Sequence, residues 1–224
     1  MTKTVDYYFT PVSPWTYLGH ERFAAMCARH GATIRVKPCD IGGKVFPISG
    51  GLPLAKRAPQ RQAYRMMELK RWRSYLDLPL TLEPKYFPTN PEPASLLIVA
   101  ATRLGPHPAM ALTGAVLRAC WVEEKDVGDP ATLRRIMIDA GFDADVLTRI
   151  ANGPDVRATY EANTQEAIER GVFGAPTYAL GEELFWGQDR LDFVARALAG
   201  NGAAVDPAQA PQGPAGLCCA ALTD

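Results

Sequence analysis

The sequence has little cysteine and very little histidine, and both shortages narrow what the chain can do. Only five cysteines and three histidines occur among 224 residues. The cysteines form no Cys-x-x-Cys pair and show no spacing typical of a zinc site. The histidines stand singly and complete neither a nucleophile–base pair nor a set of metal ligands. The sequence therefore predicts neither a dithiol redox centre nor a bound metal.

Net charge and long apolar runs are also missing. The 24 basic and 24 acidic residues cancel, so the total charge gives no indication of nucleic acid or of an acidic membrane surface. No apolar stretch is long enough to cross a bilayer, and no signal peptide precedes the first predicted strand. We expect a cytoplasmic protein without a nucleic-acid or membrane partner.

The N-terminal segment has the clearest local signals. Val5–Phe9 is short and rich in β-branched and aromatic residues, which is typical of a buried strand. A turn at Thr10-Pro11 leads into a helix, with Ser13 at the N-cap and Pro14 at the first helical position. Thr33–Lys37 alternates like a second strand. The first forty residues thus predict a β-α-β unit with parallel strands.

Ser13 has two interpretations. Capping a helix is what serine most often does at such a position. A hydroxyl at a helix N-terminus also lies where backbone N–H groups and the positive end of the helix dipole favour an anion. Ser13 is therefore a candidate for stabilising a thiolate or an oxyanion, and its position alone does not separate the two roles.

The middle of the chain is dominated by helical patterns. Residues 40–62 look irregular and basic, and helices are expected at about 62–76, 93–103, 107–124, 130–139, 143–151 and 154–170. Strand character returns at Thr177–Leu180, which pairs with Leu184–Trp186 as a hairpin. A last helix is expected over Arg190–Ala199, with Asp189 as its N-cap.

The resulting order, β-α-β, a helical block and β-β-α, predicts an α/β thioredoxin-like fold interrupted by a large all-helical insertion. Residues 1–40 and 171–200 would form the thioredoxin-like domain, and residues 41–170 the insertion. After residue 200 the composition shifts to Gly, Ala, Pro and Gln, so 201–224 is expected to be a flexible tail. The sequence assigns no role to the vicinal pair Cys218-Cys219 in that tail.

Five motifs follow one another in this chain: Tyr-Tyr-Phe-Thr-Pro-Val-Ser-Pro-Trp-Thr-Tyr-Leu at 7–18, Gly-Gly-Leu-Pro-Leu-Ala-Lys-Arg at 50–57, Leu-Lys-Arg-Trp at 69–72, Gly-Val-Phe-Gly-Ala-Pro-Thr at 171–177 and Phe-Trp-Gly-Gln-Asp-Arg-Leu at 185–191. In sequence and spacing, over about residues 4–199, they resemble the 2-hydroxychromene-2-carboxylate isomerases. These are relatives of the kappa-class glutathione transferases within the DsbA-like thioredoxin superfamily.

The resemblance implies a glutathione-dependent cis–trans isomerisation. Members of this family interconvert 2-hydroxychromene-2-carboxylate and trans-o-hydroxybenzylidenepyruvate during naphthalene-type breakdown of aromatic hydrocarbons. In the family's mechanism the glutathione thiolate adds to the conjugated substrate, a bond rotates, and elimination releases the isomer. The implied partner is a small aromatic carboxylate, and a homodimer is implied because related enzymes are usually dimers.

By the same resemblance, Ser13 is the catalytic serine and would favour the thiolate of bound glutathione over its thiol. It occupies the position at which redox relatives carry the first cysteine of their Cys-x-x-Cys motif. The second position is Thr16, which has no sulfur. We therefore reject disulfide oxidoreductase activity, and the reacting sulfur must come from outside.

Glutathione binding is assigned by resemblance to two further segments. Ala175-Pro176 would form a cis-proline turn that pairs with the cysteinyl part, although without the family pattern an ordinary proline at a strand start is the alternative. The γ-glutamyl end is assigned to Trp186, Gly187, Gln188 and Asp189. Asp189 would face the α-amino group, or only cap its helix, and both roles are compatible.

The substrate residues are the least constrained. Lys44, Lys56 or Arg57 would pair with the substrate carboxylate, and Tyr86 matches a tyrosine near the family's substrate pocket. For each cation the alternative is a solvated surface charge. Two other functions stay open: a kappa-type transferase that leaves the glutathione adduct intact, and a glutathione-binding module without catalysis.

Overall fold

A computed structural model describes residues 2–200, and a four-stranded mixed sheet lies at its centre. The strands are β1 (Thr4–Phe9), β2 (Thr33–Pro38), β3 (Thr177–Leu180) and β4 (Glu183–Trp186), in the spatial order β2-β1-β3-β4. β1 runs parallel to β2 and antiparallel to β3, and β3 and β4 form the expected hairpin. The chain has the thioredoxin-like α/β fold predicted from the sequence.

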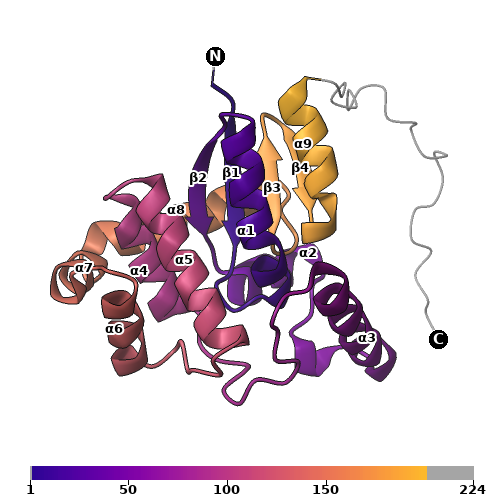
Figure 1. The fold of residues 1–224 in the computed structure, drawn as a ribbon, viewed down its shortest axis with the longest axis horizontal. Helices are drawn as coiled ribbons and strands as arrows, with labels where there is room; N and C mark the ends of the chain where they lie inside the picture. Colours follow the sequence, from indigo (N-terminus) through magenta and orange to yellow (C-terminus); the bar gives the residue numbers. More distant parts are fainter. Residues whose placement is uncertain (1, 201–224) are drawn as a thin grey trace.

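The two faces of the sheet are covered by different helices (Figure 1). Helices α1 (Pro14–Arg29) and α9 (Leu191–Ala199) lie on one face, and α8 (Pro154–Glu169) lies on the other. Because side chains alternate along a strand, Tyr7 belongs to the core cluster that contains Phe23 of α1, whereas Tyr8 packs with Ala167 of α8. β1 is therefore buried from both sides.

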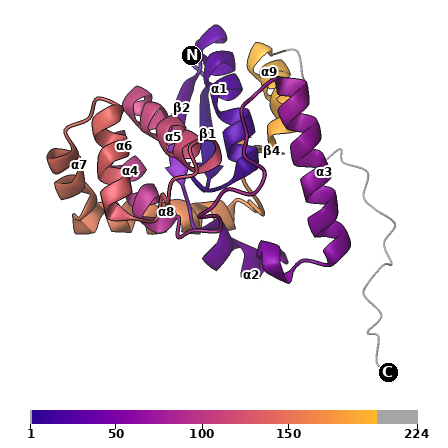
Figure 2. The ribbon, with the colours of Figure 1, turned by 60° about the horizontal axis from the view of Figure 1, so that its bottom comes forward.

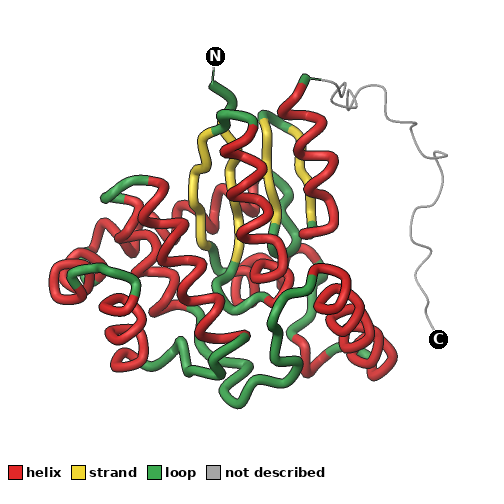
Figure 3. Tube along the Cα trace, in the orientation of Figure 1, coloured by secondary structure: helices red, strands yellow, loops and turns green. Residues whose placement is uncertain are grey.

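The segment between β2 and β3 is all helical, as predicted (Figure 3). It contains a π-helical turn (Ile41–Val45), α2 (Phe46–Ser49), a 3₁₀ turn (Leu54–Lys56), α3 (Pro59–Leu76), α4 (Glu92–Thr102), α5 (Pro106–Trp121), α6 (Pro130–Asp139), α7 (Ala144–Ala151) and α8. Helices α4 to α7 gather on the β2 side, and α3 stands on the opposite side (Figures 1 and 2). Among the described residues, no helix is long and apolar enough to span a membrane.

The insertion shares a core with the sheet. Leu97 of α4 and Leu117 of α5 belong to the same buried cluster as Val5 and Val36. Whether residues 41–170 form a separate folding unit stays a prediction, as does the division at residues 40 and 171. The predicted tail, with Cys218 and Cys219, lies outside the described residues.

Two local expectations were wrong. Residues 40–62 are not irregular throughout, since short helical turns occupy much of the segment and α3 begins at Pro59, a residue type suited to the first helical position. Asp189 does not cap the last helix. It lies in a 3₁₀ turn, Gln188–Arg190, and its carboxylate accepts a hydrogen bond from Arg190 at 2.6 Å. This turn displaces the start of α9 to Leu191, and the N-cap residue, Arg190, makes no side-chain capping bond.

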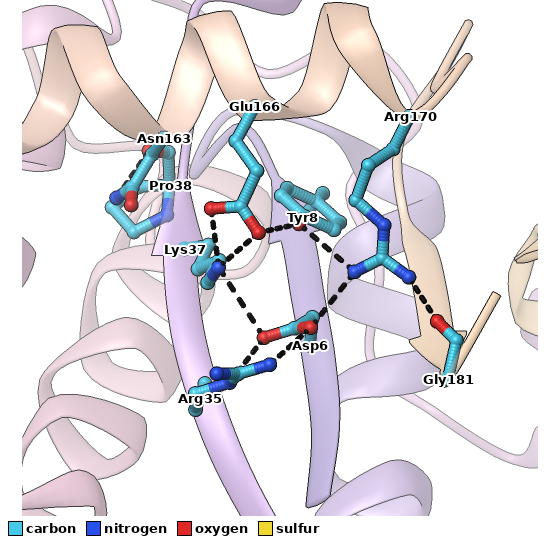
Figure 4. Close-up of polar contacts among 9 residues, drawn as sticks. All are labelled: Asp6, Tyr8, Arg35, Lys37, Pro38, Asn163, Glu166, Arg170 and Gly181. Carbon is cyan, nitrogen blue, oxygen red and sulfur yellow. Dashed lines mark hydrogen bonds and ion pairs between the residues drawn. The ribbon is translucent and has the colours of Figure 1, made fainter.

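A buried carboxylate holds the α8 face together (Figure 4). Asp6 of β1 is almost fully buried and forms ion pairs with Arg35 at 2.5 Å, Arg170 at 2.9 Å and Lys37 at 3.4 Å. The three cations come from β2 and from the end of α8. One carboxylate therefore joins both of these segments to β1.

Glu166 adds a second carboxylate to the same cluster (Figure 4). It accepts hydrogen bonds from Lys37 at 2.5 Å and from the Tyr8 hydroxyl at 2.8 Å. Arg170 also donates to the carbonyl of Gly181 in the turn between β3 and β4. The cluster fixes α8 across the sheet, and every charge in it faces at least one opposite charge.

Candidate active site

Ser13 caps α1, as predicted. Its side-chain oxygen accepts a hydrogen bond from the backbone N–H of Thr16 at 3.3 Å, and its own N–H donates to the Thr10 carbonyl at 3.1 Å. The hydroxyl proton of Ser13 has no acceptor among residues 2–200. A hydroxyl that accepts from the helix keeps its proton for a ligand. Capping and anion stabilisation are therefore compatible at this residue.

Thr16, at the second position of the Ser-x-x-Thr motif, is fully buried. Its side chain has no exposed surface, and within residues 2–200 its hydroxyl finds no hydrogen-bond partner. Thr16 has no thiol, and its buried hydroxyl is not accessible as a hydrogen-bond donor to a ligand. Ser13 retains 8% exposure and is the residue of the pair that a ligand can reach.

The Ala175–Pro176 peptide bond is cis, which confirms the turn expected from the resemblance. The Pro176 carbonyl accepts a hydrogen bond from the N–H of Gly187 at 2.9 Å. Because Thr177 pairs with Tyr8, the cis turn lies at the same end of the sheet at which β1 leads toward Ser13. The fold thus brings Ser13, the cis turn and the Gly187 turn to one end of the sheet.

The Gly187 turn is anchored to α1 through Gln188. This side chain is buried, and its amide oxygen accepts a hydrogen bond from Arg22 at 2.7 Å. A Cβ at Gly19 would lie only 2.8 Å from the Gln188 Cβ, so α1 needs glycine at this contact. The Gln188 side chain therefore positions the turn through its amide oxygen, which faces Arg22 of α1.

Trp186 lies on the other side of this turn. It is half-exposed, and its ring packs against Phe173 with centroids 4.7 Å apart. The two rings and Arg190 line a cleft of about 250 Å³ beside the β3–β4 hairpin, together with Thr177 and Leu184. Ser13 is not part of its lining. Phe173 and Arg190 were not candidate site residues in the sequence. What marks them in the structure is the exposed ring pair of Phe173 and Trp186 beside the Arg190 cation.

Neither the cleft beside the hairpin nor a second one brings together the four residues assigned to the substrate. Lys44 lines the second cleft, of about 320 Å³, with Asn90, Arg157 and Tyr160 among its neighbours, and the lining includes none of the other three. Lys56 is exposed in the 3₁₀ turn before α3. Tyr86 is 42% exposed, with the Lys85 ammonium 5.0 Å from its ring centroid.

Arg57 and Arg65 form a different arrangement. Arg57 is half-buried, donates to the Leu52 carbonyl at 2.8 Å and lies 5.9 Å from the Phe46 ring centroid. Arg65 is also half-buried, on the inward face of α3. Arg65 was not expected from the sequence, because an arginine in an amphipathic helix resembles a surface charge. Its spacing of four residues from the buried Leu69 is the signal that places it inside.

The chain is similar to known proteins along most of its length. Residues 4–199 match the DSBA-like thioredoxin domain. The chain belongs to the DSBA-like thioredoxin family. Within the family it is similar to a 2-hydroxychromene-2-carboxylate isomerase of Sphingobium xenophagum, with 31% identity over 194 residues that cover 87% of this chain and 97% of that protein.

Two further similar proteins extend the comparison. A glutathione S-transferase kappa 2 of Caenorhabditis elegans is 27% identical over 212 residues, covering 88% of this chain and 92% of that protein. A solved 2-hydroxychromene-2-carboxylate isomerase superposes with a TM-score of 0.71 at 28% identity, over 88% of this chain and 95% of that one. The family resemblance seen in the sequence is confirmed, and the relatives are enzymes of two kinds.

Proposed function

We propose that the protein is a glutathione-dependent cis–trans isomerase that interconverts 2-hydroxychromene-2-carboxylate and trans-o-hydroxybenzylidenepyruvate in the catabolism of aromatic hydrocarbons. The observation that carries the proposal is the Ser13 hydroxyl at the N-terminus of α1, in a chain similar along most of its length to isomerases of that name. The free hydroxyl proton of Ser13 fits a thiolate acceptor at this position.

Glutathione, when bound, supplies the thiolate that adds reversibly to the conjugated substrate. Ser13 donates its hydroxyl proton to the sulfur in a hydrogen bond, and the positive end of α1 favours the charged form. Both effects lower the pKa of the thiol toward neutrality. The Ala175-Pro176 turn and the segment Trp186, Gly187, Gln188 and Asp189 hold the peptide. Gln188 also keeps that segment against α1.

A kappa-type transferase is the second candidate function. The similarity to the nematode kappa 2 enzyme spans nearly all of both chains, and a transferase needs the same stabilised thiolate. The two activities differ in the fate of the glutathione adduct. An isomerase eliminates glutathione from the adduct and releases the isomer, whereas a transferase releases the adduct intact. A glutathione-binding module without catalysis is the third candidate, and it would have no use for Ser13.

The test follows the absorbance of 2-hydroxychromene-2-carboxylate with and without glutathione. We expect isomerisation to require glutathione, and Ser13→Ala to lower kcat/KM by about 10²-fold because one thiolate donor is lost. Ser13→Ala also removes a helix cap, at a cost of about 1 kcal/mol. Ser13→Asp keeps a capping oxygen but offers no proton, so it should remain folded and be equally inactive.

The control variants are Ser13→Thr, which keeps cap and donor, and Ser74→Ala, at an exposed serine of α3. Glutathione binding without isomerisation would favour the transferase, and full activity in Ser13→Asp would remove the donor from the mechanism. Absence of glutathione binding would reject both enzymes. We also propose a cytoplasmic homodimer that binds neither nucleic acid nor membranes, and light scattering of the purified protein tests the dimer.

A further inference from the structure

Two neighbouring arginines before and within α3 lack a carboxylate. Arg57 and Arg65 take part in none of the ion pairs formed among residues 2–200. Arg65 lies on the helix face that carries Leu69, which has no exposed surface, and Trp72, which packs against the core. Guanidinium groups placed toward a protein interior are normally neutralised by an acid.

The electrostatics of the pair are unfavourable without an anion. Burial, followed by the charge of Arg57, lowers the pKa of Arg65 to about 10. Burial, followed by the charge of Arg61, also lowers the pKa of Arg57. Both groups remain charged at neutral pH, so each keeps a charge that the surrounding protein disfavours. An anion between them would relieve burial and repulsion together.

Aromatic rings support both guanidinium groups. The Arg57 guanidinium lies 5.9 Å from the Phe46 ring centroid, and that of Arg65 lies 5.6 Å from the Phe87 ring centroid. Of the N–H groups of Arg57, only Nε–H donates a hydrogen bond, to the Leu52 carbonyl. Arg65 makes one long contact, of 3.7 Å, to the sulfur of Met66. Most of their N–H donors therefore remain for a ligand, while the rings offer flat apolar surfaces.

We propose that Arg65, together with Arg57, binds the carboxylate of a planar aromatic substrate and determines the preference for it. A guanidinium fork matches a carboxylate geometrically, and the Phe46 and Phe87 rings suit an aromatic acid. Two residues assigned to the substrate from the sequence belong to this arrangement or adjoin it, since Arg57 is part of the pair and Tyr86 precedes Phe87 in the chain. The identity of the substrate rests on the proposed function, whereas the recognition of a carboxylate does not.

The test compares two non-reactive probes with the same ring system, chromone-2-carboxylate and chromone-2-carboxamide, by titration calorimetry without glutathione. We expect the wild-type protein to bind the carboxylate about 10- to 100-fold more tightly than the amide, as for a charge-assisted bidentate pair. Arg65→Gln and Arg57→Gln should each lose most of this preference. Arg65→Lys should keep part of it, because the charge remains but the fork is lost.

Arg61→Gln is the matched control, since it removes the same charge from an exposed position one turn away from Arg65 on α3. It should retain the preference, and thermal unfolding should show that all variants are folded. Equal loss in Arg61→Gln and Arg65→Gln would overturn the inference.

A second titration, with glutathione alone, separates the two possible carboxylate sources. We expect Arg65→Gln to bind glutathione as the wild type does. If the variant instead loses glutathione binding and keeps the chromone preference, the assignment is wrong. The probes need no turnover, so a failed isomerase assay and a failed carboxylate preference are independent results.

Discussion

The two faces of the sheet bury consecutive tyrosines of β1 in opposite environments. Tyr7 stacks on Tyr178 at 5.5 Å and lies within hydrogen-bond distance of the His20 Nδ1, at 3.3 Å. Tyr8 donates to Glu166 and lies beneath the cations of Lys37 and Arg170. Neither ring has exposed surface. The side chains around Tyr7 are mainly aromatic, and those around Tyr8 are ionic.

The difference shows two ways of burying a polar group. On the α1 face, burial favours the neutral form of His20, and its contacts suit that form: Nε2–H donates to the Met110 carbonyl at 3.0 Å and Nδ1 accepts from Tyr7 at 3.3 Å. On the α8 face the charges remain, and their partners compensate for lost hydration. Loss of a hydroxyl should matter little on the first face, and loss of a carboxylate should matter greatly on the second.

The largest effect is expected from Asp6→Asn on the ionic face. The substitution keeps the shape of the side chain but leaves Arg35, Lys37 and Arg170 without their shared carboxylate. We expect the free energy of unfolding in urea to fall by about 3–5 kcal/mol, as when one partner of a buried ion pair is removed. Asp155→Asn is the control. Its exposed pair with Arg103 should contribute at most about 1 kcal/mol. A similar loss of unfolding free energy in Asp6→Asn and Asp155→Asn would show that the buried carboxylate matters no more than an exposed one.

The second prediction concerns pH and the α1 face. Burial lowers the pKa of His20 below its ordinary value of 6.5, although the charge of Glu21 and the bond to Met110 oppose this. The unfolded chain then binds a proton at higher pH than the folded one, so stability present above pH 6.5 is lost as the pH falls. The loss should reach at most about 2 kcal/mol by pH 5.

Urea unfolding at a series of pH values measures this slope. His20→Gln should flatten it between pH 7 and 5, whatever the variant does to stability at pH 7. His107→Gln, at an exposed histidine, should leave the slope as it is. An unchanged slope in His20→Gln would show that other groups cause the acid sensitivity.

The smallest effect is expected from Tyr178→Phe. The Tyr178 hydroxyl is buried and has no hydrogen-bond partner among residues 2–200. Its removal should leave stability unchanged or raise it by about 1 kcal/mol, because no bond is lost and a desolvated polar group disappears. Tyr7→Phe, which loses the contact with His20, should instead cost about 1 kcal/mol. A loss in Tyr178→Phe as large as in Tyr7→Phe would mean that the two hydroxyls are equivalent.

Much of the fold could be predicted from local patterns. The β-α-β start, the helical block and the final hairpin follow from residue periodicity, and the Ser13 cap from its place before Pro14. The cis bond at Pro176 followed from the family resemblance, because no dipeptide specifies it. Partners far apart in sequence could not be predicted. Nothing near Asp6 indicates that Arg170 will reach it.

In the candidate active site, too, contacts between distant segments could not be predicted from the sequence. Asp189 looked like a cap, but whether a 3₁₀ turn precedes a helix depends on how the preceding loop packs. The assignment of Gln188 to glutathione stays a prediction, but its contacts with Arg22 and Gly19, on a helix at the other end of the chain, could not be predicted from the local sequence. Arg65 was missed because its lack of a carboxylate partner is a property of the folded neighbourhood.

The contact between Gly19 and Gln188 also has a consequence for synthesis on the ribosome. The helix that carries Ser13 is made early, whereas the turn that completes the site is made near the end of the described chain. Until Thr177–Leu180 emerges, β1 has only β2 beside it, and the edge that β3 later covers is unpaired. The nascent chain must therefore carry an incomplete sheet through the synthesis of the whole helical insertion, and the site is assembled as one of its last steps.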